Sequence, residues 1–230
     1  RVDVPLERKN LSSSMLLVVD KSYTGKRITN NFEVADGGIS LVRGQDYIVT
    51  FKNNKNVGTA TITFKGVGNY KSSVKETYRI KKRSVKNLTY TFDSKVTYTG
   101  KKKTANIIVE NGTKTLIKNV DYTIRYRNNK EIGTAVAVIK GIGNYTGTKN
   151  ITFKIVPGRP KITIESQRGS YALIRFSGVK SRTGYRLYLS KDPDFASGVQ
   201  RFSTRTSKMI LRGMSRGNVY FIRAKAYKRV

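Results

Sequence analysis

One feature of this sequence limits its fold more than any other: a long stretch occurs twice, 75 residues apart. Residues 53–70 read "NNKNVGTATITFKGVGNY", and residues 128–145 read "NNKEIGTAVAVIKGIGNY". The same offset relates Tyr23-Thr24-Gly25-Lys26 to Tyr98-Thr99-Gly100-Lys101, and Asp46-Tyr47 to Asp121-Tyr122. A unit of this length is too long for a solenoid repeat and suits a small independent domain. The chain therefore contains an internal duplication of one such domain.

The pattern inside each copy predicts strands. "DYIVTF" and "VGTATITF" alternate apolar with polar residues, and "KNNKN" between them contains asparagines that tolerate a left-handed turn. "GVGNY" and "GIGNY" read as turns that enter a last strand. No stretch has a capped, 3.6-residue apolar period. Short strands separated by Gly and Asn turns predict an all-β fold of antiparallel sandwiches.

These residues carry a resemblance. The pattern "YTGK…DYxxxYxNNxxxGTAxxxxKGxGNYxGT…ITFKI" resembles the Ig-like repeats of surface and secreted proteins from Firmicutes and related bacteria, over about residues 9–157. The first copy departs from it at "NYKSSVKETYRI". The resemblance implies an extracellular, non-catalytic stalk or binding region of a multi-domain protein.

The remainder of the chain follows a different pattern. "YALIRFSGVKSRTGYRLYLSKDPDF" and "LRGMSRGNVYFIRAKAY" are similar to a fibronectin type III domain, with Tyr220 as its corner tyrosine. The resemblance implies one more strand than the segment holds. We therefore expect three consecutive antiparallel β-sandwich domains in an elongated rod. Their predicted bounds are 1–8 for the tail of a preceding segment, 9–82 and 83–157 for the two Ig-like copies, and 158–230 for the type III-like domain.

Charge is the strongest feature of the composition. The chain has 46 Lys+Arg against 14 Asp+Glu, a formal net charge of +32. Such an excess attracts polyanions. Residues 158–230 are the most basic of the three segments.

Alternation along two strands of that segment predicts a binding face. Strands C and F are neighbours in type III domains, so the resemblance places their outward residues side by side. Cations mixed with aromatic rings suit sulfated or phosphorylated polymers, sugars and nucleic acid. The alternative interpretation is an ordinary solvated face, or one covered by a further strand. The predicted ligand-binding residues are Arg186, Tyr188, Phe221, Arg223, Lys225 and Tyr227.

Two further basic runs are secondary candidates, Lys81-Lys82-Arg83 and Lys101-Lys102-Lys103. Exposed runs of this kind are more often solvated than functional. Together they could still form a discontinuous basic stripe.

Nothing in the sequence indicates catalysis. The chain has no cysteine and no histidine, which excludes thiolate and imidazole metal ligands, a Cys nucleophile and a His base. No pair of carboxylates stands out, and no P-loop, GxSxG, dinucleotide or calcium-loop motif occurs. We predict no catalytic residues, no cofactor and no bound metal. Asp46 and Asp121 are expected to serve turns.

Three hypotheses about function follow. In the first, the chain is an adhesive module of a Gram-positive bacterial surface or secreted protein. Its expected partners are anionic polymers or glycans such as teichoic acid, glycosaminoglycan or mucin glycan, or extracellular DNA, on a host or cell-wall surface. In the second, it is a spacer that displays an enzymatic or adhesive head. In the third, it is a dedicated nucleic-acid binder, although no helix-turn-helix, RRM, KH or zinc pattern occurs. No apolar run is long enough to span a membrane.

Overall fold

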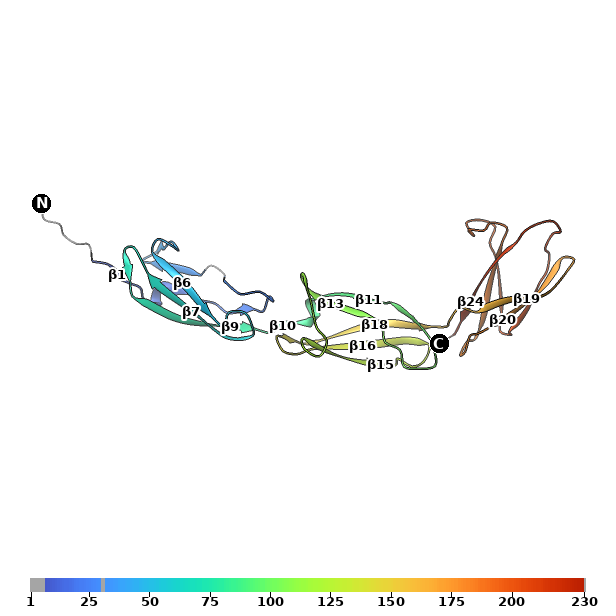
Figure 1. Ribbon diagram of the computed structural model, residues 1–230, viewed down its shortest axis with the longest axis horizontal. Coiled ribbons are helices and arrows are strands. Elements are labelled where there is room, and N and C mark those ends of the chain that lie inside the picture. The colour runs from blue at the N-terminus through green and yellow to red at the C-terminus, as the bar shows by residue number, and fades with distance from the viewer. Residues whose placement is uncertain (1–6, 30–31, 230) are drawn as a thin grey trace. The chain divides into compact units, whose positions relative to one another are not determined.

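The computed structural model describes residues 7–29 and 32–229, and these residues form β-strands joined by turns and two short 3-10 helices, with no α-helix (Figure 1). The all-β prediction is confirmed. By their contacts, the residues fall into two compact units: 1–91, 108–124 and 139–149 form the first, and 92–107, 125–138 and 150–230 form the second. This division runs through the second copy, so the three predicted domain bounds stay predictions. Residues 1–6 of the predicted tail lie outside the described residues.

The first copy forms two main sheets and one short strand pair. One sheet has the order β3-β9-β7-β6, the other has β2-β4-β5, and β1 pairs with β8. A 3-10 helix, η1, spans Ser13–Met15. The strands are β1 (Lys9–Asn10), β2 (Leu16–Leu17), β3 (Lys21–Ser22), β4 (Glu33–Asp36), β5 (Ile39–Ser40), β6 (Tyr47–Lys52), β7 (Gly58–Gly66), β8 (Tyr70–Lys71) and β9 (Ser73–Lys81).

The second copy repeats this plan. Its sheets have the orders β12-β18-β16-β15 and β11-β13-β14, and β10 pairs with β17. The 3-10 helix η2 spans Val85–Asn87. The strands are β10 (Arg83–Ser84), β11 (Thr89–Phe92), β12 (Lys95–Thr97), β13 (Ile107–Asn111), β14 (Lys114–Thr115), β15 (Tyr122–Arg127), β16 (Gly133–Gly141), β17 (Tyr145–Thr146) and β18 (Thr148–Val156).

The cores follow the predicted alternation. In β7, Ala60, Ile62 and Phe64 are fully buried, and Val34 of the facing sheet is also buried. The equivalent strand β16 buries Ala135, Ala137 and Ile139. Inward apolar residues at every second position bury one face of each sheet and leave the other to solvent, which is the pattern of a two-layer sandwich.

The sheets are not purely antiparallel. The hairpins are antiparallel, but β3 pairs with β9 in parallel, with Lys21 opposite Ile80. In the second copy β12 pairs with β18 in parallel, with Lys95 opposite Lys154. An early and a late strand of each copy therefore lie side by side, which period-two alternation could not reveal, because alternation is the same in either direction.

The shared glycines and acids have structural roles. Gly68 has a φ of +59°, and a Cβ there would lie 2.5 Å from the carbonyl oxygen of Gln45. Asp46 closes the same loop, since its carboxylate accepts a hydrogen bond from the Val42 amide at 2.8 Å. Asp121 does the same for the Ile117 amide at 3.0 Å. The expectation that both acids serve turns is confirmed.

The third segment has two three-stranded sheets, β19-β20-β23 and β22-β21-β24. Both sheets contribute to one core that includes Ile174, Phe176, Tyr185 and Leu187. The hydroxyl of Tyr220 accepts a hydrogen bond from the Ser215 amide at 3.1 Å, which is the arrangement expected of a corner tyrosine. The strands are β19 (Lys161–Arg168), β20 (Tyr171–Ser177), β21 (Gly184–Ser190), β22 (Gln200–Thr204), β23 (Lys208–Leu211) and β24 (Phe221–Tyr227).

Candidate binding face

Pairing of β21 with β24 brings the predicted residues to one face. Arg186 lies opposite Lys225, and Tyr188 lies opposite Arg223. Residues directly opposite each other in an antiparallel pair share a face. Leu187, between Arg186 and Tyr188, is fully buried on the other face. The sequence therefore predicted the orientation of both strands correctly.

Each of the three predicted cations of this face lies over an aromatic ring. The Arg186 guanidinium is 4.9 Å from the ring centroid of Tyr227, and Lys225 Nζ is 5.7 Å from that of Tyr188. These contacts run diagonally between the two strands, so Arg186 and Lys225, which lie opposite each other, each have a ring beside them. A guanidinium that lies over a ring still directs its N–H groups outward in its own plane, where they can bind the oxygens of an anion.

Arg223 differs from the other two cations. Its guanidinium lies 4.1 Å from the ring of Phe195 and donates a hydrogen bond to the carbonyl oxygen of Pro193 at 3.2 Å. Part of its hydrogen-bonding capacity is therefore used by the loop after β21. Phe221 lies opposite Ser190, at the far end of the two strands from Tyr227.

The structure adds Arg201, which the sequence prediction missed. Arg201 of β22 lies opposite Tyr188 and is exposed on the same face. Its strand has no clear alternation of its own, and only the pairing of β22 with β21 reveals its position.

Two of the three acids of this segment, Glu165 and Asp192, have partners outside the candidate face. Glu165 binds Arg175 and also Lys208 at 3.2 Å, and Arg175 and Lys208 hold the pKa of that carboxyl below its usual range. The backbone N–H groups of Asp194, Ala196 and Ser197 lower the pKa of Asp192, because its carboxylate accepts their hydrogen bonds. Within residues 7–29 and 32–229, no carboxylate forms an ion pair with the three predicted cations.

A hollow within the second compact unit borders this face. Its volume is about 720 Å³. Lys225 and Tyr227 line it, together with four further cations and no acid among its lining residues. The four additional cations are Lys95, Lys154, Arg159 and Lys228. No sequence pattern indicated that these residues lie together, since Lys95 and Lys154 come from two strands and Arg159 and Lys228 from two segments outside strands.

The secondary basic runs are less uniform than predicted. Lys81 forms an ion pair with Asp20, Nζ to Oδ2 3.0 Å, and Arg83 is partly buried. Lys82 lies exposed between β9 and β10. Lys101 and Lys102 are exposed, whereas Lys103 is partly buried and its amide donates to the carbonyl of Asn129 at 2.6 Å. The predicted stripe that joins the two runs stays a prediction.

Two further observations concern sites of other kinds. No group of three or more His, Cys, Asp or Glu side chains gathers as a metal site among the residues that the structure describes. Within the same residues, no helix is long and apolar enough to cross a membrane.

Comparison with known proteins gives no family. No protein-family model matches the chain, and no curated protein matches it. Among solved structures, domains A168-A170 of titin have 12% identity to this chain and a TM-score of 0.29. The match covers 93% of this chain and 91% of the titin chain. The FN1-FN3 domains of chicken CNTN1 have 10% identity and a TM-score of 0.30, covering 81% of this chain and 94% of their own. Scores this low carry no argument, so the fold assignment rests on the sheets described above.

Proposed function

We propose that the chain is a non-catalytic extracellular region of a bacterial surface or secreted protein, and that it binds an anionic polymer or glycan. The binding surface is the outer face of β21 and β24. One observation supports this most: Arg186 and Lys225 lie over aromatic rings rather than beside carboxylates. Their charges are therefore available to the oxygens of a sulfate, phosphate or carboxylate group.

The chemistry of the face fits a repeating polyanion better than a small ligand. Both strands present cations together with aromatic rings, and in β24 two cations, Arg223 and Lys225, lie between two rings, so successive anionic groups and sugar rings of a polymer can be bound along the face. The neighbouring hollow extends the same charge, because its cations Lys95 and Lys154 lie near Lys225 in the second compact unit. The net charge of +32 adds long-range attraction, which is not specific.

The test is binding of the full chain to heparin, hyaluronan, teichoic acid, sialylated mucin glycans and DNA at about 0.15 M salt, close to physiological ionic strength. The test variant is Arg186→Ala with Lys225→Ala. The matched control is Lys180→Ala with Arg205→Ala, which removes the same charge outside β21, β22 and β24. We expect one polymer to be preferred, and only the first variant to abolish that preference.

The other two hypotheses predict different results. A spacer would bind all polyanions of equal charge density alike, and both variants would weaken binding equally. A nucleic-acid binder would prefer DNA over heparin. For DNA, each lost phosphate contact lowers the slope of log affinity against log salt by about 0.9, so the two variants could also be compared by slope.

A further inference from the structure

The two copies meet through side chains of the repeated motifs, all within the first compact unit. Tyr23, from the Tyr-Thr-Gly turn of the first copy, contacts Tyr145 of the second edge to face, with ring centroids 5.4 Å apart at 85°. Tyr23 is 3% exposed and Tyr145 0%. Lys114 Nζ lies 5.9 Å and 5.7 Å from these two rings. Tyr145 is therefore buried partly by the other copy.

A second loop of the first copy reaches the same place. The amide of Val57 donates a hydrogen bond to Asn144 Oδ1 at 2.9 Å, and Asn144 Nδ2 donates to Asn56 Oδ1 at 3.3 Å. A Cβ on Gly25 would lie 3.6 Å from Lys114 Cδ, so the lysine stem packs against the turn. We call Asn111, Lys114, Asn144 and Tyr145 the covered surface.

The first copy has a corresponding surface, and within residues 7–29 and 32–229 no other copy covers it. At the offset of 75 residues, the covered surface corresponds to Asp36, Ile39, Asn69 and Tyr70, which we call the open surface. Ile39 is 71% exposed, Asn69 is exposed and Tyr70 is partly exposed. An exposed isoleucine beside a partly exposed tyrosine is apolar area that a contact would remove from water.

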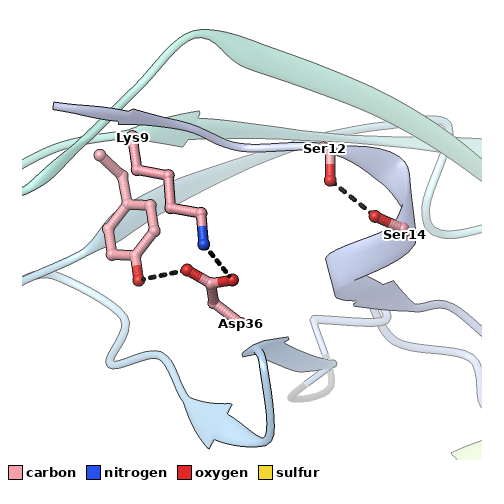
Figure 2. A network of polar contacts seen from close by, with 5 residues as sticks. Lys9, Ser12, Ser14 and Asp36 are labelled. Carbon is pink, nitrogen blue, oxygen red and sulfur yellow. Dashed lines mark hydrogen bonds and ion pairs between the residues drawn. The ribbon is translucent and has the colours of Figure 1, made fainter.

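In both surfaces, a hydrogen bond of the tyrosine hydroxyl fixes the tyrosine to a second residue of that surface, Asp36 in the open surface and Asn111 in the covered surface. Tyr70 donates its hydroxyl hydrogen to Asp36 Oδ2 at 3.1 Å, and Lys9 binds Oδ1 at 2.7 Å (Figure 2). In the second copy, Asn111 Nδ2 donates to the Tyr145 hydroxyl at 3.3 Å. The preceding strands pair alike, with Lys9 opposite Tyr70 and Arg83 opposite Tyr145, both in parallel.

We propose that the open surface is a docking surface for another repeat of the same kind. That repeat would bind through its own Tyr-Thr-Gly turn and Asn-Asn loop, as the first copy binds the second. Within this chain, the Tyr-Thr-Gly turn and Asn-Asn loop of the first copy already bind the covered surface, which is the equivalent of the open surface in the second copy. One residue, Lys82, separates β9 from β10, so a link this short brings the end of one repeat directly onto the next. At the open surface, the incoming tyrosine would pack on Ile39 instead of Lys114.

The test is a chain with residues 9–82 duplicated ahead of Lys9, compared with the 230-residue chain. The added copy carries Tyr70→Phe, so that only the original Tyr70 is read. Tyrosines are nitrated with tetranitromethane and the rates are read by mass spectrometry. In the 230-residue chain we expect Tyr70 to react faster than Tyr145. In the extended chain we expect the Tyr70 rate to fall about tenfold, toward that of Tyr145, because a covered side chain reacts only after local opening.

The control is the extended chain with Tyr23→Ala in the added copy only, which keeps the length and charge. Tyr70 should then remain reactive, whereas Tyr23→Phe in the added copy should keep it protected. Circular dichroism checks that each variant is folded. An unchanged Tyr70 rate in the folded extended chain would overturn the proposal. Equal rates for Tyr70 and Tyr145 in the 230-residue chain would overturn it too, because the contact on which it is based would then be absent.

Discussion

Gly68 offers a direct test of why the duplicated glycines are needed. Two glycines of the first copy have similar backbones, Gly68 with φ +59° and Gly37 with φ +55°. They differ in surroundings: a Cβ on Gly37 would meet nothing within 4 Å, whereas a Cβ on Gly68 would lie 2.5 Å from the Gln45 oxygen. Gly37→Ala therefore measures the cost of the backbone alone, and Gly68→Ala measures that cost plus the clash.

The magnitudes follow from these surroundings. A left-handed backbone costs an L-residue about 1–2 kcal/mol, and replacing glycine recovers about 0.4–1 kcal/mol from the unfolded chain. Gly37→Ala should therefore cost about 1 kcal/mol. At Gly68, ordinary contact begins at 3.4 Å. The loop at Gln45 would have to move, and overpacking of this kind costs about 1–3 kcal/mol more.

The assay is hydrogen exchange of the β7 amides, read by mass spectrometry. A local probe is needed because a chain of several sandwiches does not unfold in one two-state step. Each 1.4 kcal/mol changes the exchange rate about tenfold. Gly68→Ala should thus exchange roughly five- to a hundredfold faster than Gly37→Ala. Equal rates for the two variants would refute the close approach of Gly68 to Gln45.

Three further predictions concern charge and ionisation. The ion pairs with Arg175 and Lys208 lower the pKa of Glu165 from its ordinary value of 4.5. The stability that these ion pairs contribute is therefore present above pH 4.5 and is lost as the pH falls through the lowered pKa. Glu165→Gln should remove this loss of stability in acid, measured by hydrogen exchange of the β20 amides. Burial raises the pKa of Tyr90 to about 12, so an ultraviolet titration should show a late-titrating tyrosine component that Tyr90→Phe reduces by one tyrosine. Arg201→Ala should weaken binding to the preferred polymer more than Arg205→Ala does, because only Arg201 lies beside Tyr188.

The sequence predicted most of the strands because alternation reports burial directly. The outward positions of β21 and β24 follow from this alternation. The role of Asp46 follows from a different signal, because Asp is common in turns, where its side chain accepts hydrogen bonds from nearby backbone amides. Asn53 and Asn128, the turn formers of the duplicated stretch, have φ values of 55° and 52° as expected.

What the sequence did not predict depends on contacts between distant residues. The parallel pairing of β3 with β9 joins residues about 60 apart, and alternation contains no information on it. Arg201 joins the candidate face only through strand pairing. Tyr145 lies in the predicted "GIGNY" turn, but it also contacts Tyr23 of the other copy, which the pattern of one copy does not reveal. Such contacts depend on how distant segments pack together, which the alternation within one strand does not encode.

The parallel pairing in each copy has a mechanical consequence. In the first copy, β3 lies near the start and β9 at the end, and the two run in the same direction. A tension that pulls the two ends apart along these strands would slide β3 and β9 past each other. Their hydrogen bonds would then be loaded together in shear rather than opened one after another, and the same holds for β12 and β18. In each copy, stretching along these strands would therefore have to break this group of hydrogen bonds together.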